Sequence, residues 1–295
     1  MKIYDCFTYF DEKHLAEIRL NTLRDSVDFF VICEAKENHK GIAKKLNFPM
    51  EKFKDIQHKI IYLTFDSFPK FNSAWQRQDY QRNYLINGLS NAKKNDLILF
   101  SDADEIPNPK ILDEYNENYK DTVGIFIQKF FYYKLNISVP TYSQWEGTRP
   151  CKKKNLKSFS WLRDKTKIKN LKYQFWRFDK YKNISKIDNG GWHFSFLGNA
   201  DFIASKIKSY VHNEYDKDEY TNLEKINFRI KNMIDPFDRK KTLTKVLIDE
   251  SYPGYIFKNQ DKYKDIKKLL TINRIKYQNH FWEKNKNPKN KDSNN

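Results

Sequence analysis

Two aspartates separated by one residue form the motif of this sequence that is best suited to chemistry. Asp102 and Asp104 directly follow Asp96–Phe100 (DLILF), an apolar run that predicts a strand. In an open α/β sheet, ligands bind beyond the carboxyl ends of the strands. Two carboxylates in such a turn can converge on one Mg²⁺ or Mn²⁺ ion, which usually shares its ligand shell with substrate phosphates. The motif therefore predicts a metal–diphosphate site; the alternative is an acidic turn that caps the next helix.

A second group of candidates lies on a predicted helix over Ser73–Leu89. Arg77 and Gln81 are four residues apart and share a face of that helix, whereas Arg82 lies about 100° round from Gln81. A guanidinium directed at the strand ends can neutralise a bound diphosphate. The alternative is surface salt bridging with neighbours such as Asp79.

The elements that must position these side chains alternate between strands and helices over about the first 130 residues. This alternation is typical of an α/β layer with a mostly parallel sheet. The predicted strands are Lys2–Phe7, Asp28–Cys33, Lys59–Phe65, Asp96–Phe100, Val123–Gln128 and Phe130–Leu135. The predicted helices are Glu12–Leu23 with Asp11 as its cap, Ser73–Leu89, and one that starts over Lys110–Tyr115.

The second half of the chain is less regular. Strands are predicted over Tyr173–Phe178 and Trp192–Phe196, and helices over Ala200–His212 and Asp218–Met233. Glu283–Asn295 is rich in Lys and Asn and is expected to be a frayed tail. Because no linker or internal repeat is visible, we expect one domain over residues 1–282 and a polar tail over 283–295.

Composition excludes several classes of protein. The 23 Phe, 19 Tyr and 6 Trp can form a sizeable core, so disorder is not expected. The apolar runs are far shorter than the roughly 20 residues that span a bilayer, and the N-terminus lacks the apolar region of a signal peptide. Three cysteines without a paired spacing predict neither a disulfide scaffold nor a thiolate zinc site. These features favour a cytoplasmic protein.

Four well-known catalytic motifs do not occur. The eight glycines form neither GxGxxG nor GxxxxGK[ST], which disfavours a Rossmann dinucleotide site and a P-loop. The sequence also lacks HExxH and GxSxG, which leaves zincin and α/β-hydrolase interpretations without support.

The positive charge is concentrated in one stretch of the chain. The net charge is +17, and Lys152–Lys186 holds 13 Lys or Arg against two Asp. Such a stretch could bind an anionic acceptor, a phospholipid surface or nucleic acid. The alternative is a lysine-rich segment that is only exposed to solvent. Only 10 of the 55 basic residues are Arg, the residue best shaped for phosphate and base contacts, so nucleic acid is not the expected partner.

Five blocks in the same order resemble glycosyltransferase family 17, which includes many shorter bacterial and viral members. The blocks are IYDCFTYFDE, EIRLNTLRDSVDFFVICEA, QRQDYQRN, LILFSDADEIP and GGWHFSFLG. The similarity runs from about Met1 to about Tyr215. The resemblance implies a GT-A-type fold, a nucleotide-sugar donor, a divalent cation (Mn²⁺ or Mg²⁺) and an inverting transfer.

The resemblance also implies roles for individual residues. Asp104 is the preferred direct metal ligand, and Asp102 is expected to contact the ion or the donor ribose. The imidazole of His193 would be a third ligand, although a lone His between aromatics is commonly a core residue. Glu34 either accepts from the uracil or ribose of the donor or is a charge that leaves the sheet into solvent, and Trp192 either stacks on a sugar or fills the core. Arg77 and Arg82 are then donor-binding candidates, and Glu105 either supports the metal ligands or caps a helix.

An inverting transfer also needs a carboxylate that accepts the acceptor hydroxyl proton. Asp188 lies close in sequence to His193, and Glu146 lies in a Trp-Glu-Gly loop, so both are candidates. His212 and Glu214 are candidates for the donor or acceptor site; they do not share a helix face and need a loop to converge.

The expected function is therefore transfer of GlcNAc or a related hexose from a UDP-sugar to a glycan hydroxyl. A lipid-linked glycan acceptor would suit peripheral membrane contact through Lys152–Lys186. Two alternatives stay open: a metal-dependent phosphodiesterase or nuclease, and a basic nucleic-acid-binding protein. The first would usually need more metal-binding side chains, and the second predicts steeply salt-dependent binding that Asp104→Ala leaves unchanged.

Overall fold

The computed structural model describes residues 1–119, 121–209 and 211–266. The first of its two sheets has the strand order β3-β2-β1-β4-β9. Its strands are β1 (Ile3–Tyr9), β2 (Phe29–Ala35), β3 (Ile60–Phe65), β4 (Leu97–Phe100) and β9 (Arg149–Lys152). The first four are parallel, and β9 pairs antiparallel with β4. The carboxyl ends of β1, β2 and β4 therefore meet at one edge, as the order of elements predicts.

The second sheet has the order β11-β7-β6-β10-β5, and β8 also pairs with β6. Its strands are β5 (Glu105–Pro107), β6 (Val123–Tyr132), β7 (Ile137–Ser138), β8 (Trp145–Glu146), β10 (Ile184–Ser195) and β11 (Thr244–Lys245). Only β6 and β10 run parallel, and the other pairs are antiparallel. A mixed α/β architecture is confirmed. The expectation of one mostly parallel sheet holds for the first sheet and is wrong for the second.

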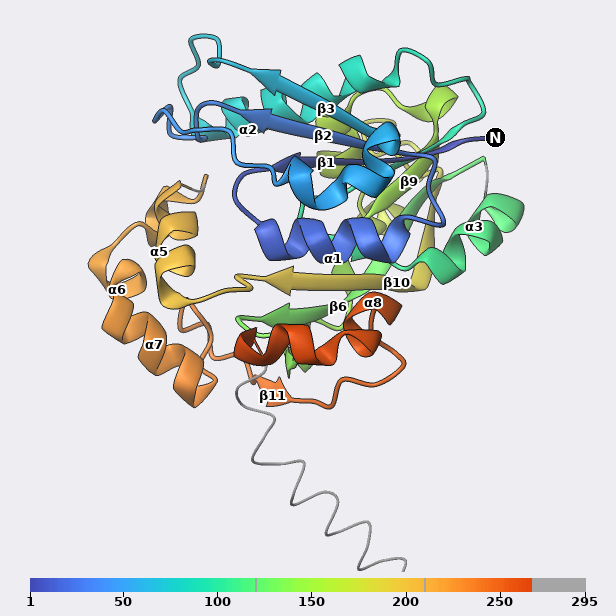
Figure 1. The fold of residues 1–295 in the computed structure, drawn as a ribbon. Helices are drawn as coiled ribbons and strands as arrows, with labels where there is room; N and C mark the ends of the chain where they lie inside the picture. The colour runs from blue at the N-terminus through green and yellow to red at the C-terminus, as the bar shows by residue number, and fades with distance from the viewer. Residues whose placement is uncertain (120, 210, 267–295) are drawn as a thin grey trace, which may run out of the picture.

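Helix α1 (Lys13–Leu23) lies between the two sheets (Figure 1). Its Leu20 and Leu23 belong to the core that covers the first sheet. Its Leu15 and Ile18 pack instead with side chains of the second sheet. Because two faces of α1 are buried, the helix shows no clear apolar stripe in the sequence.

The other helices lie outside the two sheets. Helix α2 (Ala74–Tyr84) begins at Ser73, whose hydroxyl accepts from the Gln76 amide, and α4 (Phe159–Asp164) packs beside it over the first sheet. The remaining α-helices are α3 (Leu112–Asn118), α5 (Ala200–Ser209), α6 (Asp218–Thr221), α7 (Leu223–Asn232) and α8 (Gly254–Lys258). The 3₁₀ helices are η1 (Met50–Lys59), η2 (Leu85–Leu89), η3 (Pro109–Ile111), η4 (Pro140–Tyr142), η5 (Lys153–Asn155), η6 (Ile168–Lys172), η7 (Asn213–Tyr215) and η8 (Gln260–Ile266).

Several predicted strands differ from the structure, and Trp192–Phe196 falls mostly within the longer strand β10, which begins at Ile184. Val123–Gln128 and Phe130–Leu135 are one continuous strand, β6, which ends where Tyr133 enters the left-handed region at φ 63°. Tyr173–Phe178 is not a strand, and its aromatic side chains are exposed. Aromatic residues favour strands only where a neighbouring strand and a packed face are available, and this segment has neither.

The predicted helix boundaries also change. Glu12 rather than Asp11 precedes α1, and the Asp11 carboxylate accepts from the Asn47 amide. The predicted helix Asp218–Met233 breaks at Asn222, whose side chain caps α7. Helix α5 ends at Ser209, and Tyr210 lies outside the described residues. The predicted tail 283–295 and the end of the predicted domain 1–282 also lie outside them. In the part of the chain that is described, no helix has the length and apolar character that a membrane span requires.

A fully buried arginine fixes the turn after β4. Arg19 of α1 donates through Nε and Nη2 to both carboxylate oxygens of Asp5, at 2.8 and 2.7 Å. Its Nη1 donates to the carbonyl oxygens of Asp102 and Glu105, both at 3.0 Å. Its Nη2 also donates to the Ser101 hydroxyl at 2.7 Å. One guanidinium thus links α1, β1 and the Asp102–Asp104 turn.

Replacing Arg19 by Lys tests this linkage. A single ammonium cannot reproduce the planar set of donors, so buried carbonyls and a carboxylate lose partners. We expect Arg19→Lys to lower the free energy of unfolding by about 3 kcal/mol, measured by urea denaturation. Arg24→Lys is the matched control, because Arg24 pairs with Asp55 at the surface and should cost under about 0.5 kcal/mol. An equal loss of the free energy of unfolding in both variants would contradict the central role of Arg19.

Candidate functional site

A cavity of about 370 Å³ lies at the carboxyl ends of β1, β2 and β4. Its walls come from the turns after these strands, from α2, from the second sheet and from α5. Figure 1 shows α5 beyond the arrowheads of β2 and β10, where it closes this end of the molecule. Asp102, Ala103 and Asp104 form part of the wall. The position matches the expectation that ligands bind beyond strand ends.

Two arginines hold the Asp102 carboxylate. Arg82 Nη2 lies 3.1 and 3.3 Å from its two oxygens, and Arg163 Nη2 lies 3.3 Å from Oδ2. Burial raises the pKa of Asp102, but these guanidinium groups outweigh it and lower the pKa to about 2. The Asp102 side chain keeps 30% of its surface exposed at the cavity. Asp102 is therefore ionised at neutral pH and accessible to a ligand.

Asp104 has a different set of partners. Its Oδ1 lies 3.4 Å from His193 Nε2, and its Oδ2 accepts from Lys206 Nζ at 3.0 Å. Burial raises the pKa of Asp104, but Lys206 and His193 outweigh it and hold that pKa well below its usual range. Lys206 Nζ also lies 3.4 Å from Glu12 Oε1. The ammonium of Lys206 thus bridges two carboxylates of the cavity wall.

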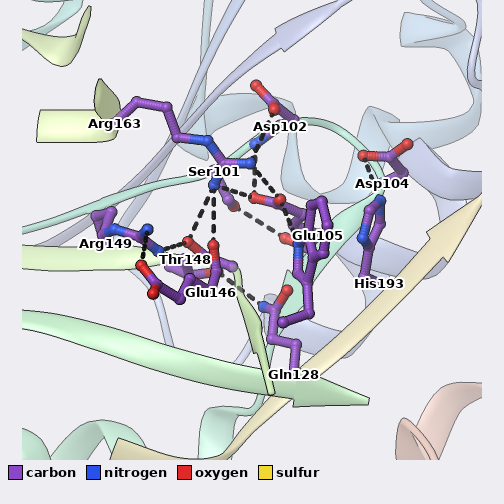
Figure 2. A network of polar contacts seen from close by, with 12 residues as sticks. Ser101, Asp102, Asp104, Glu105, Gln128, Glu146, Thr148, Arg149, Arg163 and His193 are labelled. Carbon is purple, nitrogen blue, oxygen red and sulfur yellow. Dashed lines mark hydrogen bonds and ion pairs between the residues drawn. The ribbon is translucent and has the colours of Figure 1, made fainter. Parts of the chain in front are cut away.

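Glu105 organises the wall behind Asp102 (Figure 2). Its Oε1 accepts from Arg163 Nη2 at 2.6 Å and from Trp145 Nε1 at 2.8 Å, and its Oε2 accepts from Arg163 Nη1 at 2.9 Å. Burial lowers the pKa of Arg163, but Glu105 and Asp102 outweigh it and raise that pKa above the usual arginine value. Glu105 lies on β5 and caps no helix, so it positions Arg163 and Trp145 instead.

Aromatic side chains line the wall contributed by the second sheet and its loops. Phe130 packs edge-to-face against Trp145 and His193, with ring centroids 5.0 and 4.5 Å apart. The other aromatic residues of this wall are Tyr132, Tyr142, Phe196 and Phe237. An aromatic face opposite a charged turn suits a ligand with both an apolar ring face and a charged group.

Comparison with known proteins identifies the family. The family model described as "Glycosyltransferase family 17" matches residues 1–242. The chain belongs to glycosyltransferase family 17. The prediction of a glycosyltransferase is therefore confirmed.

The relatives match a shorter part of the chain. Beta-1,4-mannosyl-glycoprotein 4-beta-N-acetylglucosaminyltransferase of Homo sapiens is 34% identical over 106 residues, which are 32% of this chain and 20% of that protein. The Mus musculus protein of the same name is 33% identical over a segment with the same coverage. The aligned segment thus spans about a fifth of the length of these relatives.

Among solved structures, the inositol-1-phosphate CTP transferase from T. maritima covers 64% of this chain and 85% of its own, at 12% identity. Its TM-score of 0.33 is too low to support an inference.

In this family 17 chain, the predicted donor and metal residues Arg82, Asp102, Asp104 and His193 meet at the cavity. They come from α2, the turn after β4, and β10. The pairing of Arg82 with Asp102 was not among the interactions expected for these residues. The packing of His193 between Phe130 and Trp145 agrees with the core alternative, while its Nε2 faces Asp104.

Three predicted donor-binding residues lie outside the lining of this cavity. The buried Glu34 carboxylate accepts from the Asn47 and Phe48 amides, from the Tyr62 hydroxyl at 2.6 Å and from Lys44 Nζ, so it anchors the loop after β2. Arg77 donates to the carbonyls of His39 and Phe71 and supports the same loop. Trp192 packs in the core, and its Nε1 donates to the Ser251 carbonyl.

The predicted catalytic carboxylates also point elsewhere. Asp188 is exposed on an irregular part of β10 and pairs with Lys186 at 3.0 Å. Glu146 Oε2 lies 3.2 Å from Arg149 Nη2 and 3.4 Å from the Ile168 amide, behind the wall that Glu105 organises. Neither Asp188 nor Glu146 lines the cavity.

His212 and Glu214 converge, as they can in a loop. His212 Nδ1 lies 2.7 Å from Glu214 Oε1, and the His212 ring packs edge-to-face on Trp75 at 4.8 Å. His212 and Trp75 line the cavity rim. Gln81 lies deeper, where its Oε1 is 2.7 Å from His39 Nε2 and its amide donates to the Cys33 carbonyl.

Sequence reasoning missed Arg163, Lys206 and Glu12. Arg163 belongs to the stretch Lys152–Lys186, whose charge was attributed to surface contacts or solvent. The sequence feature that could have identified Arg163 is its residue type: arginine is rare in this chain, with 10 Arg against 45 Lys, and it is suited to buried bidentate ion pairs. Lys206 carried no comparable signal, since it is one of many lysines in the chain and the sequence does not show which face of α5 meets the cavity.

Asp104 and His193 are the side chains best placed to hold a divalent cation. Within the described residues, no group of three or more His, Cys, Asp or Glu side chains forms a complete metal cage. One carboxylate and one imidazole fit an ion that takes its other ligands from water and substrate phosphates. His193 Nδ1 is buried and has no hydrogen-bond partner among the described residues. The donor set therefore fits a substrate-bridged Mn²⁺ or Mg²⁺ better than a resident structural ion.

Asp102→Asn tests the electrostatic role of Asp102. Its folded pKa of about 2 lies below the ordinary 3.8, so ionised Asp102 contributes stability above about pH 4 and loses it as the pH falls through 2. We expect Asp102→Asn to lower the free energy of unfolding by about 1–2 kcal/mol at pH 5–7, with partial exposure limiting the cost. The difference in the free energy of unfolding between Asp102→Asn and the wild-type chain, measured by urea denaturation, should become smaller below pH 4. A constant difference down to pH 2 would contradict the assignment.

Proposed function

We propose that this chain is an inverting, divalent-metal-dependent glycosyltransferase with a GT-A-type fold. It moves GlcNAc or a related hexose from a UDP-sugar to a hydroxyl of a glycan. The observation that carries the proposal is the Asp102–Asp104 turn at the end of β4, which shares one cavity with Arg82, Arg163 and Lys206. Names of the mammalian relatives favour GlcNAc as the sugar.

The donor diphosphate is proposed to bind among these cations. Arg82 and Arg163 already converge on Asp102. The N–H groups of Arg82 that do not bind Asp102 can donate to phosphate oxygens, and Arg163, whose terminal nitrogens bind Glu105 and Asp102, adds positive charge. A charged side chain held rigidly in a partly buried wall needs little reorganisation when the leaving group gains charge. Glu105 contributes by fixing the Arg163 guanidinium rather than by touching the donor.

Asp104 and His193 would hold Mn²⁺ or Mg²⁺, with Asp102 facing the ion or the ribose. A bound ion supplies charge neutralisation for the departing nucleoside diphosphate. Lys206 and such an ion both need the Asp104 carboxylate, so they compete for it.

Inversion requires the acceptor oxygen to attack the anomeric carbon opposite the diphosphate. The new bond joins the acceptor oxygen to that carbon, the bond to the diphosphate oxygen breaks, and a carboxylate accepts the hydroxyl proton. The described carboxylates that line the cavity are Glu12, Glu37, Asp102, Asp104 and Glu105. Since arginines hold Glu105 and Asp102, and Asp104 is proposed as a metal ligand, Glu12 and Glu37 become the candidate bases in place of Asp188 and Glu146.

The aromatic wall is proposed to bind the sugars. The faces of pyranose rings carry C–H groups that pack on aromatic side chains, and Trp145 and Tyr142 present such surfaces beside His193. Glu105 holds Trp145 through its indole N–H, which links this surface to the charged wall. A glycan or lipid-linked glycan would enter as the acceptor along this side.

Thermal denaturation with a panel of nucleotide sugars tests the donor and the metal together. A donor at about 100 times its Kd stabilises the fold by about 2.7 kcal/mol, which raises the melting temperature by about 4 °C for a chain of 295 residues. We expect one UDP-sugar to give this shift with Mn²⁺ and to lose it in Asp104→Ala. The matched control is Asp113→Ala, which removes an exposed aspartate of α3. Absence of any shift, or metal-dependent cleavage of nucleic acid, would overturn the proposal.

The competition at Asp104 gives a separate test. Lys206→Met removes the ammonium that neutralises Asp104, so the carboxylate becomes a stronger ligand for a divalent cation. We expect the Kd for Mn²⁺, measured by isothermal titration calorimetry without donor, to fall several-fold in Lys206→Met. Lys208→Met is the control on the same helix. Unchanged Mn²⁺ affinity would show that the ion does not use this carboxylate.

A further inference from the structure

The segment 165–182 joins α4 to β10 and exposes large apolar side chains. Phe175 and Phe178 keep 81% and 91% of their surface in solvent, and Leu171 and Trp176 are also exposed. Soluble folds rarely place so many large apolar groups together in water unless the surface binds something. This is the segment whose aromatic content predicted a strand.

The segment is anchored firmly at its base. Asn170 Nδ2 donates to the carbonyls of Lys165 and Tyr181, at 2.7 and 3.0 Å. The Tyr181 ring packs edge-to-face on Trp161 of α4, with centroids 4.9 Å apart. Because the base is held, the exposed aromatics belong to an ordered loop and are not the result of a loose chain end.

Positive charge surrounds the exposed aromatics. The segment carries Lys165, Lys167, Lys169, Lys172, Arg177, Lys180 and Lys182. Its single acidic residue, Asp179, is already paired with Arg177 at 2.8 Å and with Lys180 at 3.1 Å. Aromatic side chains prefer the interface between hydrocarbon and headgroups, and lysines are attracted to anionic lipids. The combination is complementary to an anionic bilayer surface.

We propose that segment 165–182 is a membrane-docking loop. Phe175, Trp176 and Phe178 enter the interfacial layer of an anionic phospholipid bilayer, and the surrounding basic side chains contact the lipid phosphates. The inference goes beyond the proposed function and does not rest on the chemistry of the cavity. The base of the loop nonetheless contacts the protein behind the cavity wall, because the Ile168 amide donates to Glu146 and the Arg149 guanidinium donates to the Thr166 carbonyl. Docking would therefore hold the cavity close to the lipid surface.

Vesicle sedimentation tests the proposal. The full chain is mixed with vesicles of phosphatidylcholine alone or of phosphatidylcholine with phosphatidylglycerol. We expect binding to the anionic vesicles, and a loss of about tenfold in the partition coefficient for the double variant Phe175→Ser/Phe178→Ser. Phe228→Ser is the matched control, because Phe228 is an exposed aromatic of α7 outside the loop. The basic residues of 267–295 are common to all variants and cancel in the comparison.

Tryptophan fluorescence reports whether the aromatic side chains enter the lipid layer, which electrostatic attraction to the surface alone would not cause. Tryptophan emission should shift to the blue on anionic vesicles, and Trp176→Ser should remove the shift. Three results would overturn the proposal: no binding by the wild-type chain, equal binding by the loop variant and the control, or concentration-dependent self-association that the loop variant abolishes. The thermal shift with a UDP-sugar should be unchanged in the loop variants, so failure of this proposal and failure of the proposed function can be distinguished.

Discussion

The ion pair of Arg19 with Asp5 is the interaction on which the cavity depends. Both side chains are fully buried, and a buried pair is tolerable only when every donor finds a partner. Arg19 Nη1, which does not bind Asp5, donates to the carbonyls of Asp102 and Glu105. The hydrogen bonds that the buried guanidinium needs therefore also fix the shape of the turn. The Asp102 and Asp104 carboxylates can then point outward. Asp102 is held by Arg82 and Arg163, while Asp104 is held by His193 and Lys206.

Much of the first sheet could be predicted from the sequence, and much of the second could not. Strands such as Leu97–Phe100 are short, apolar and covered on both faces, so local pattern and final structure agree. In β6 and β10 the pairing depends on residues far apart in the chain. An aromatic run therefore gave no reliable signal: Phe130 and Phe131 belong to a strand, whereas Phe175 and Phe178 lie in solvent.

The candidate site was predictable where one segment carries the geometry. Asp102 and Asp104 follow a strand, so their place at the sheet edge follows from local order. Their partners come from α2, α4, α5 and β10, and only the packed fold brings these together. Glu34 and Arg77 show the converse: residue types suited to binding a donor instead hold the loop after β2. Sequence alone could not separate a carboxylate that serves the cavity from one that supports its wall.

Lys206 reaches the cavity from α5, a helix that belongs to neither sheet. Helix α5 rests on α7 within an apolar cluster that holds Ile203, Ile207 and Ile226 together with side chains of the cavity wall such as Phe130. The charge balance at Asp104 therefore depends on how an outer layer of helices packs. A substitution at Ile207 or Ile226, neither of which lines the cavity, can alter the environment of Asp104 through this packing. Sequence change in the buried contact between these outer helices thus provides a route by which selection can tune the site while its wall residues stay the same.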